Sequence, residues 1–260
     1  MNPAGSSILV TGASSGIGAA TARLLACAGA TVGLVGRRER ELAAVLGDCR
    51  AHAPASRMWV ADLGDLDRAA AVAAEAWDAF GGLDALINNA AIPKVRAATD
   101  LRPEDVEDAL RVNFLSPVRM TLTVLPWMLE RGGGLIVNVG SMGGKVGIAH
   151  EAAYCASKFA LTGWSEALAI DLHGTGITVR LVHPGPVDTD IWRRPGEERA
   201  VYDGPKVPAE EVAAGVVAVL AADTFEHYLP DLKEVVLTKE QDVDAYLAVA
   251  AALAGGTARP

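Results

Sequence analysis

Tyr154 and Lys158 form a Tyr-x-x-x-Lys pattern within residues 151–173, a segment that is predicted to be helical. Residues four apart share one face of a helix, so the phenol and the ammonium are expected to point the same way. A phenol with its ordinary pKa of about 10 is a poor acid–base catalyst at neutral pH, and a nearby ammonium lowers that pKa. This pair is therefore the candidate for proton transfer. Tyr202 and Lys206 repeat the spacing but are excluded, because the Gly-Pro between them cannot continue a helix.

Ser141 and Asn113 are the polar residues that could support this pair. Ser141 follows a predicted strand, at the end where open α/β sheets bind ligands, so its hydroxyl can hold a substrate oxygen beside the phenol. Capping of the next turn is the alternative for this serine. Asn113 lies in a predicted long helix, four residues before Pro117. Because proline has no N–H, the carbonyl of Asn113 lacks its helical donor and can anchor a water that relays protons to Lys158; a plain proline kink is the alternative.

A glycine-rich turn follows the first predicted strand and opens the first predicted helix. Its glycines allow a tight turn and let the backbone approach a ligand closely. The N-terminus of the helix presents unpaired N–H groups and the positive end of its dipole to a phosphate group. An ordinary glycine-rich connection between strand and helix is the alternative. The residues assigned to phosphate binding are Gly12, Ser14, Ser15, Gly16, Ile17 and Gly18.

The end of the second predicted strand indicates which nucleotide this turn would bind. An acidic residue at this place would bind the ribose 2′-hydroxyl of NAD(H) and repel a 2′-phosphate. The chain instead has Gly36, followed by Arg37 and Arg38. A guanidinium suits a phosphate dianion, so the two arginines favour NADP(H) over NAD(H). Solvated charges at the start of a helix are the alternative.

The composition limits the class of protein. The chain has 260 residues, 51% hydrophobic and 21% charged, which suits one globular domain and excludes a disordered chain. Its longest apolar stretches, 213–222 and 245–254, are half of the roughly 20 residues that cross a membrane, and its N-terminus does not resemble a signal peptide. A net charge of −9 without a basic stripe argues against nucleic-acid binding. Three widely spaced cysteines and five histidines without ligand spacing indicate a reducing cytoplasm and no metal.

Strands and helices alternate along most of the chain. The predicted strands are near-continuous apolar runs, as expected when helices cover both faces of a parallel sheet. This alternation predicts a doubly wound α/β fold with a Rossmann-like parallel sheet, as a single domain over residues 1–260. The predicted strands are 7–11, 31–36, 57–61, 83–89, 134–139 and 176–183, and the predicted helices are 16–30, 38–47, 65–80, about 103–130, 151–173 and 209–222.

The C-terminal part departs from this rhythm. Residues 190–208 are rich in proline, glycine and charge, and a loop of this length in a compact domain is usually functional. We expect this loop to border the substrate. After the helix at 209–222, a short strand is expected around 226–237, followed by a final helix of about 240–254. The last of these lies in an atypical helical tail, about 238–256.

Taken together, the motifs resemble the short-chain dehydrogenase/reductase family between about residues 6 and 190. The resemblance rests on their order and spacing rather than on any single motif. Two features depart from the family pattern: its usual Asn-Asn-Ala-Gly reads Asn-Asn-Ala-Ala here, and the helical tail replaces a strand with a glycine-rich end. The motifs are the TGxxxGxG turn at 11–18, Asp62-Leu63, 88-NNAA-91, Asn113, Ser141, 154-YCASK-158 and 184-PGPVDT-189.

The resemblance implies a role for each matched residue. Tyr154 would be the general acid–base, and Ser141 would orient the substrate oxygen. Lys158 would bind the nicotinamide ribose and lower the pKa of the tyrosine, while Asn113 would complete a water relay. Hydride would pass between C4 of the nicotinamide and a carbonyl or carbinol carbon. The other cofactor contacts would come from Asp62 and Leu63 at the adenine, Asn89 at the adenosine ribose, and Val187 and Thr189 at the nicotinamide carboxamide and phosphate side, with Pro184 and Gly185 beside them.

The substrate pocket is expected to form around the candidate acid–base. Trp192 and Met142 favour an apolar ligand, whereas Arg193 and Arg194 either meet an acidic substrate group or are solvated loop charges. The sequence does not identify the substrate. The expected pocket residues are Met142, Gly143, Gly144, His150, Trp192 and the loop 193–206.

The resulting hypothesis is an NADP(H)-dependent reductase of ketones or dehydrogenase of secondary alcohols, acting on a small molecule. Two alternatives stay open, namely a non-catalytic NADP(H)-binding sensor and a non-redox relative such as an epimerase or a dehalogenase. A homodimer through the helices 103–130 and 151–173 is expected, with a tetramer as the alternative. Neither a membrane nor a nucleic acid is expected as a partner, and the expected location is the cytoplasm.

Overall fold

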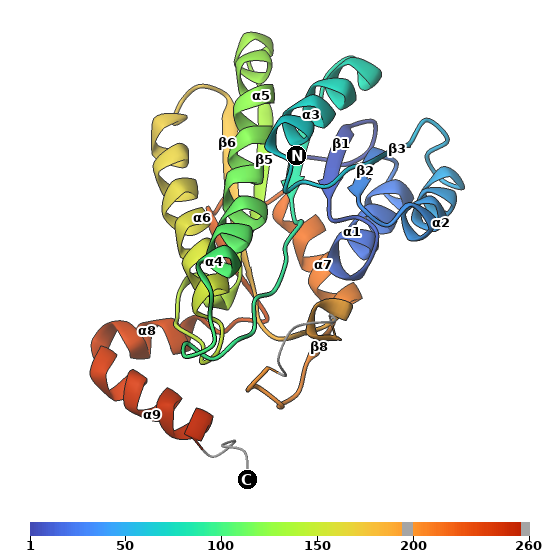
Figure 1. Ribbon diagram of the computed structural model, residues 1–260. Helices are drawn as coiled ribbons and strands as arrows, with labels where there is room; N and C mark the ends of the chain where they lie inside the picture. Colours follow the sequence, from blue (N-terminus) through green and yellow to red (C-terminus); the bar gives the residue numbers. More distant parts are fainter. Residues whose placement is uncertain (194–199, 256–260) are drawn as a thin grey trace.

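The computed structural model describes residues 1–193 and 200–255 of the chain. Within these residues, seven parallel strands form one central sheet (Figure 1). The strands of this sheet are β1 (Ser7–Thr11), β2 (Thr31–Gly36), β3 (Arg57–Val60), β4 (Ala85–Asn88), β5 (Gly134–Val139), β6 (Ile177–Pro184) and β9 (Glu226–Leu229).

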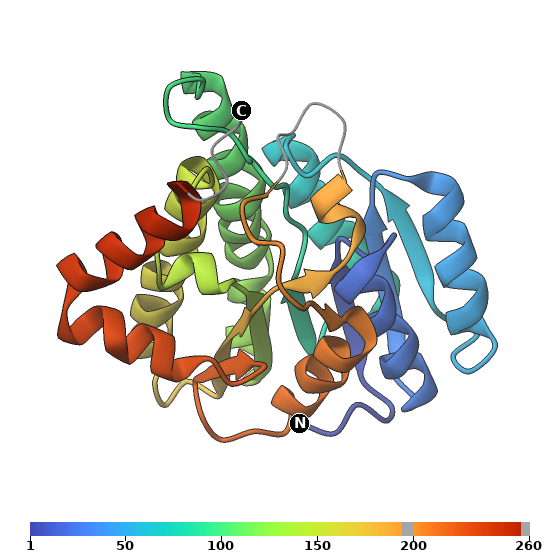
Figure 2. The same cartoon turned by 90° about the horizontal axis from the view of Figure 1, so that it is seen from below.

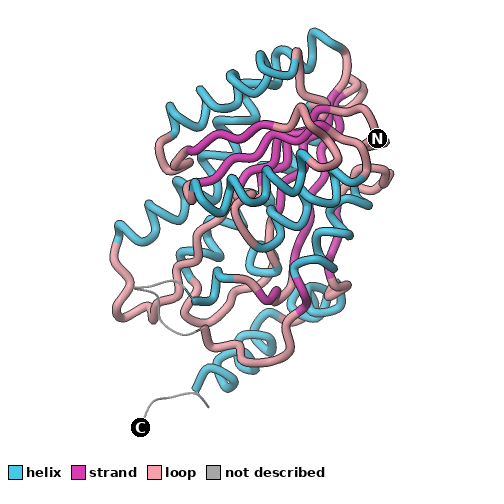
Figure 3. The backbone as a smooth tube through the Cα atoms, turned by 90° about the vertical axis from the view of Figure 1, so that its right-hand side faces the viewer, coloured by secondary structure: helices cyan, strands magenta, loops and turns pink. Residues whose placement is uncertain are grey.

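Helices cover both faces of this sheet, as Figure 3 shows. The α-helices are α1 (Gly16–Cys27), α2 (Glu39–Arg50), α3 (Leu66–Phe80), α4 (Pro103–Leu110), α5 (Ser116–Arg131), α6 (Ala152–Asp171), α7 (Ala209–Val219), α8 (Lys233–Gln241) and α9 (Val243–Gly255). Three shorter helical segments are the π-helix η1 (Arg111–Leu115) and the 3-10 helices η2 (Met142–Gly144) and η3 (Asp190–Arg193).

The order of the strands creates a crevice near the middle of the sheet. The order is β3-β2-β1-β4-β5-β6-β9, and β1 pairs in parallel with both β2 and β4. The strands β2 and β3 therefore lie on one side of β1, and β4, β5, β6 and β9 lie on the other, so the strand order reverses between β1 and β4. Ligands of open α/β sheets bind at such a reversal, outside the carboxyl ends of the strands. The predicted doubly wound α/β fold is confirmed.

Two apolar cores form because successive side chains of a strand point to opposite faces of the sheet. In β1, Ile8 and Val10 belong to one core with residues of α1, α2 and α7. Leu9, between them, belongs to the other core with residues of α3, α5 and α6. Burial of apolar side chains on both sides thus fixes the register of the central strands and holds their carboxyl ends in place.

The single helix predicted over about 103–130 is wrong in detail, because three helical segments occupy this region. The π-helix η1 separates α4 from α5, and the N–H of Ser116 donates to the carbonyl of Arg111, five residues earlier. Pro117 follows in the first turn of α5 and has no N–H, so regular i+4 bonding cannot run through this point. Asn113 consequently lies in the π-helix rather than in a regular helical turn.

The prediction of a strand around 226–237 is also wrong beyond Leu229. The strand β9 ends there because Pro230 follows and cannot donate to a strand ladder. The next residues form α8, and Asp242 separates α8 from α9 where one helix was expected. Two short strands were not predicted: β7 (Val187–Asp188) pairs with β8 (Val207–Pro208), which brings together the two ends of the loop 190–208.

The helices α8 and α9 lie together at one corner of the molecule, near the start of α6 (Figures 1 and 2). Val236 is buried in a small apolar cluster with Met142 and Val146. Two side chains of the tail also bind backbone carbonyl groups after η2. The Nζ of Lys239 donates to the carbonyl of Lys145 at 3.0 Å, and the hydroxyl of Tyr246 donates to that of Gly147 at 2.7 Å. The tail therefore holds the segment that leads into α6.

Within the described residues, no helix combines the length and the apolar character that a membrane crossing requires.

Candidate active site

A cavity of about 700 Å³ opens at the carboxyl ends of β1, β2, β4, β5 and β6. It borders every site residue predicted from the sequence except Gly18 and Asn113. Those that line it are Gly12, Ser14, Ser15, Gly16, Ile17, Arg37, Arg38, Asp62, Leu63, Asn89, Ser141, Tyr154, Lys158, Pro184, Gly185, Val187 and Thr189. The fold therefore brings residues from seven separate segments of the chain to one place.

The glycine turn requires its glycines for geometric reasons. Gly12 and Gly16 adopt φ values of +69° and +53°, a region that favours glycine. A Cβ at Gly12 would lie 2.8 Å from the Cα of Ala90, and one at Gly16 would lie 2.9 Å from Cγ2 of Thr189. Gly18 faces away from the cavity, and a Cβ there would overlap the carbonyl of Gly12. Its role is thus to let α1 pack against the turn.

The N-terminus of α1 faces the cavity with its first N–H groups available. Ser15 occupies the N-cap, but its side chain makes no capping hydrogen bond. Asn89 lines the cavity and also braces the glycine turn. Its Nδ2 donates to the carbonyl of Thr11 at 2.8 Å, and its backbone N–H donates to the hydroxyl of Thr11 at 2.9 Å. These bonds tie the end of β4 to the glycine turn and engage the amide of Asn89.

Two arginines stand at the cavity edge after β2. Nη1 of Arg37 lies 3.8 Å from Oδ2 of Asp62, and Nη1 of Arg38 lies 3.4 Å from Oδ2 of Asp190. The Nε of Arg38 also lies 3.4 Å from the hydroxyl of Ser14, in the glycine turn. Since both guanidinium groups are about half exposed, these ion pairs are weak, and a phosphate dianion could replace the carboxylates.

Tyr154 and Ser141 both line the cavity, and the Oγ of Ser141 accepts from the N–H of Gly143 at 3.0 Å, so this serine also caps the turn that follows it. Burial raises the pKa of Tyr154 above its usual range, and the nearby hydroxyl of Ser141 acts in the opposite direction. Lys158 lies beside this phenol, on the same helix. Its Nζ lies 5.8 Å from the centre of the tyrosine ring and donates to the carbonyl of Val139 at 2.9 Å. Burial lowers the pKa of Lys158 itself to about 7.

Asn113 is fully buried and uses its side chain to hold the cavity wall. Its amide group exchanges two hydrogen bonds with the backbone of Ile92, at 2.8 and 3.0 Å. It also donates to the hydroxyl of Ser157 at 3.0 Å, which in turn donates to the carbonyl of Tyr154 at 2.7 Å. The side chain of Asn113 therefore links the segment after β4 to α6.

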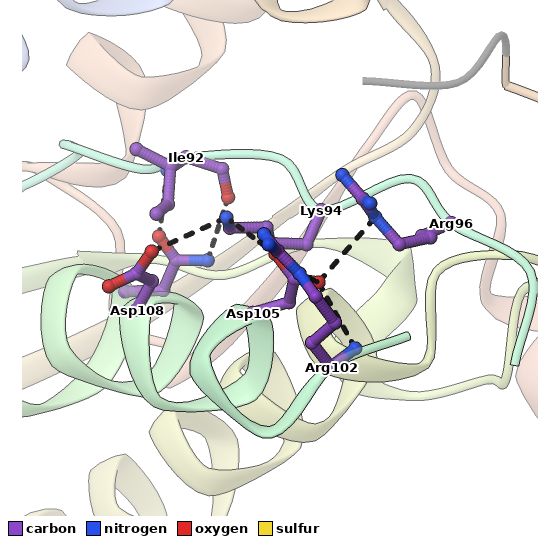
Figure 4. A network of polar contacts seen from close by, with 7 residues as sticks. Ile92, Lys94, Arg96, Arg102, Asp105 and Asp108 are labelled. Carbon is purple, nitrogen blue, oxygen red and sulfur yellow. Dashed lines mark hydrogen bonds and ion pairs between the residues drawn. The ribbon is translucent and has the colours of Figure 1, made fainter. Parts of the chain in front are cut away.

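The same wall segment is fixed by Asp105, whose side chain is only 1% exposed (Figure 4). Three cationic side chains converge on its carboxylate: Nζ of Lys94 at 3.2 Å, Nε of Arg96 at 3.5 Å and Nη2 of Arg102 at 3.3 Å. Asp108 adds a second contact to Lys94, at 3.4 Å. The ion pairs anchor the segment that contains Ile92 to the start of α4.

A buried polar network behind Ser141 was not predicted from the sequence. His183 is fully buried, with Nδ1 3.0 Å from the carbonyl oxygen of Ser141 and Nε2 3.0 Å from Oε1 of Glu226. Because a carbonyl only accepts, Nδ1 carries the hydrogen and donates to Ser141. Glu226 also contacts Lys145 at 3.0 Å and accepts from the hydroxyl of Tyr228 at 2.9 Å.

The surroundings of Glu226 favour its ionised form. The contact with His183, followed by those with Lys145 and Tyr228, lowers the pKa of Glu226 to about 2. The only sequence signal for this network was the position of His183 directly before Pro184 and Gly185, where the last family motif begins. Its partner Glu226 comes from β9, 43 residues later, and nothing local connects the two.

The predicted substrate pocket is correct only in part. Met142 lines the cavity, and a Cβ on Gly143 would lie 3.3 Å from Cε1 of Tyr154. Gly144 and His150 do not line it, because Gly144 packs under the backbone of Lys158 and His150 precedes the turn into α6.

The other pocket expectations concern the loop after β7. The side chains of Trp192 and Arg193, and residues 194–199 with Arg194, lie outside the described part of the chain. Ile191 and Tyr202, from the loop expected to border the substrate, do line the cavity. The cavity residues that the sequence did not single out include Val95, Ile148 and Glu151.

Comparisons with known proteins agree with this geometry. Residues 6–200 match the short chain dehydrogenase family. The chain is 34% identical over 232 residues to 3-oxoacyl-(acyl-carrier-protein) reductase FabG of Vibrio cholerae, which covers 85% of this chain and 92% of that protein. The chain therefore belongs to the short-chain dehydrogenase/reductase family, as the motifs indicated, and it is an oxidoreductase of that family.

Two solved structures resemble the whole chain. A short chain dehydrogenase from Burkholderia cenocepacia in complex with NADP has a TM-score of 0.82 at 26% identity, over 96% of this chain and 99% of that one. A short chain dehydrogenase/reductase from Burkholderia phymatum in complex with NAD has a TM-score of 0.86 at 25% identity, over 94% and 96%. The similar structures thus include both nicotinamide cofactors.

The ion pairs of Asp105 predict a loss of stability on substitution. Replacing Asp105 by asparagine leaves three cations without their anion, so we expect the free energy of unfolding to fall by about 2 kcal/mol at pH 7. The hydrogen bond from Arg102 is the main cause that holds the pKa of Asp105 well below its usual range. Because the folded-state pKa is depressed, the stabilisation is present above the unfolded-state pKa of about 4 and is lost as the pH falls below it.

Urea denaturation of wild type and Asp105→Asn between pH 7 and pH 3 measures this effect. The difference between them should stay constant down to about pH 5 and shrink below about pH 4. Asp108→Asn is the matched control, since Asp108 is 59% exposed and should contribute less than about 1 kcal/mol. Equal effects of the two substitutions would contradict this account.

The contact between His183 and Ser141 predicts a contrast between two variants. In His183→Asn the amide nitrogen replaces Nδ1 and keeps the bond to the carbonyl of Ser141, whereas the longer side chain in His183→Gln reaches toward Glu226 instead. Crystal structures should show Ser141 in its wild-type place beside Tyr154 in the first variant and displaced in the second. Both variants lose one hydrogen bond, so similar losses of thermal stability are expected. An unmoved Ser141 in both would refute the positioning role of His183.

Proposed function

We propose that the protein is an NADP(H)-dependent oxidoreductase that interconverts a ketone and a secondary alcohol, with Tyr154 as the general acid–base. The observation that carries this proposal is that Tyr154, Ser141 and Lys158 line the same cavity as the glycine turn. A carbonyl oxygen that accepts from both hydroxyls would lie at the reacting position.

The residues present fit a dinucleotide. The uncapped N-terminus of α1 leaves N–H groups for a phosphate, and Gly12 and Gly16 leave room where a Cβ would collide. Asp62 and Leu63 would contact the adenine, while Val187, Thr189, Pro184 and Gly185 would hold the nicotinamide end, as the family resemblance implies. When bound, NADPH supplies a hydride to the carbonyl carbon.

Tyr154 would supply the proton for this reduction. Because burial raises its pKa, the phenol holds its proton at neutral pH and is ready to donate it to the carbonyl oxygen. Ser141 would fix that oxygen, and the remaining phenolate would regain a proton from solvent. Lys158 would bind the nicotinamide ribose, and the carbonyl of Asn113 would anchor a water on the route to Lys158.

The preference for NADP(H) is supported by the surroundings of the 2′-position. Arg37, Arg38 and Ser14 stand together where β2 ends, and Gly36 provides no carboxylate there. One similar structure contains NADP and another NAD, so the arginines are the feature of this chain that decides between them.

The assembly and the location complete the proposal. A homodimer through α4, α5 and α6 is supported by exposed apolar side chains on these helices, including Leu122 at 54% and Ile170 at 74% exposure. A cytoplasmic location is supported by the three cysteines, all of which are free thiols.

Tyr154→Phe tests the acid–base role. The substitution removes only the hydroxyl, so we expect kcat for carbonyl reduction to fall at least about 100-fold, while the dissociation constant of NADPH changes less than about threefold. A panel of ketones followed by NADPH absorbance gives kcat, and fluorescence titration gives binding. Retained turnover would exclude Tyr154 as the acid–base, and tight cofactor binding without any turnover in the wild type would indicate a sensor.

The arginines give a separate prediction. Wild type should bind NADPH at least about 10-fold more tightly than NADH, and Arg37→Ala combined with Arg38→Ala should reduce this ratio to about two, because the 2′-phosphate loses its cations. Fluorescence titration with both nucleotides measures the ratio. Arg40→Ala, on the same helix, serves as the control. Equal affinities in the wild type would show that the proposed preference is wrong.

A further inference from the structure

One carboxyl group in the cavity has no partner in the protein. Glu151 is 5% exposed and lines the cavity at the N-cap of α6, three residues before Tyr154. Its backbone is engaged, since its N–H donates to Ile148 and its carbonyl accepts from Cys155. Throughout residues 1–193 and 200–255, no hydrogen-bond donor or cation contacts the carboxylate. The carboxyl of Glu151 thus borders the cavity and is available to form hydrogen bonds with a molecule bound there.

This lack of a partner is costly for the folded protein. A buried carboxylate without a donor loses its hydration and gains nothing in return. Burial accordingly raises the pKa of Glu151 to about 7. The other buried or half-buried acids described above are paired, Asp105 with three cations and Glu226 with His183 and Lys145. The chain therefore satisfies its structural carboxylates, and Glu151 is the exception.

The segment before Glu151 is held firmly in place. His150 adopts a φ of +63°, a left-handed conformation that residues other than glycine rarely adopt, and its carbonyl accepts from the N–H of Arg96 at 2.6 Å. The two tail side chains described above bind the same segment a few residues earlier. The backbone that carries Glu151 is thus held by several independent contacts, as a specific binding site requires.

From this placement we propose that Glu151 is a substrate-binding residue whose carboxyl binds a hydroxyl group that the substrate carries within a few carbon atoms of the reacting carbonyl. The inference rests on the proposed function, because it takes Tyr154 as the reacting end of the site. Glu151 at the N-cap of α6 and Tyr154 in the first turn of the helix line the same cavity, so one small substrate can contact both groups. The neighbouring cavity residues Val95, Met142 and Ile148 are apolar and would contact the rest of its carbon skeleton.

A hydroxyl suits Glu151 better than a charged group. A substrate carboxylate would be repelled by Glu151, and an ammonium would have to lose its hydration on entering the cavity. A hydroxyl is neutral and can donate to the ionised carboxyl or accept from the protonated one. The substrate class is therefore a hydroxyketone, or the corresponding diol in the reverse direction.

Matched ketones test this specificity. Wild type, Glu151→Gln and Glu151→Leu are assayed with NADPH on 2-butanone, 1-hydroxy-2-butanone and 4-hydroxy-2-butanone. We expect the wild type to prefer at least one hydroxyketone by about 10-fold or more in kcat/KM, and Glu151→Leu to reduce this preference to about twofold or less. Glu151→Gln should retain part of it. Glu166→Leu, on the exposed face of the same helix, should keep the wild-type preference.

Stability separates this role from a structural one. Because Glu151 has no partner, Glu151→Leu should melt at the wild-type temperature or above it, whereas loss of a structural residue would lower the melting temperature. If the leucine variant does not fold, the wild-type preference and its decrease in Glu151→Gln still decide. A wild type without preference for either hydroxyketone, a preference kept in Glu151→Leu, or a stronger preference for 4-amino-2-butanone would each overturn the proposal.

A binding measurement keeps the two proposals distinguishable. Calorimetry compares 1,3-butanediol and 1,2-butanediol with 2-butanol on wild type and Glu151→Leu saturated with NADP⁺. If no ketone is reduced, the proposed function fails, and the binding comparison still tests Glu151. Tighter binding of a diol in the wild type alone supports the hydroxyl site, and equal binding of the diols and the mono-alcohol refutes it.

Discussion

Buried polar groups need partners, and this protein supplies them largely through backbone carbonyl oxygens near the cavity. Lys158 donates to Val139, His183 to Ser141, and Asn89 to Thr11. Each of these carbonyl groups belongs to a strand or to the residues directly after one. Each bond therefore does two things, since it removes the desolvation cost of a buried side chain and it fixes the backbone beside the cavity. The geometry of the site follows from this pairing rather than from apolar packing alone.

The sheet and the glycine turn could be predicted because their signals are local. Apolar runs mark the strands, and glycines at 12 and 16 mark places where the backbone needs a positive φ. The tail was predicted less well. Its strand and helix patterns are short, and a proline after Leu229 ends the strand earlier than the apolar run suggested. The break between α4 and α5 followed from Pro117, but its π-helical form depends on how the two segments pack.

Residues that act through distant partners could not be recognised from the sequence. His183 is recognised as part of a network only through Glu226 on the neighbouring strand. Glu151 is recognised as a candidate only because the fold places its unpartnered carboxyl in the cavity. The burial of Tyr154, which raises the pKa of its phenol, is likewise a property of the folded chain that the spacing to Lys158 does not reveal.

The contacts of Lys239 and Tyr246 with the segment before α6 give the C-terminal helices an evolutionary consequence. The residues proposed for proton transfer lie just after β5 and on α6, while the side chains that hold the segment before α6 come from α8 and α9. Substitutions in α8 and α9 can thus change the substrate selectivity of the cavity while the residues proposed for proton transfer stay the same. Chimaeras that exchange this end between relatives would recombine selectivity and catalysis as separate units.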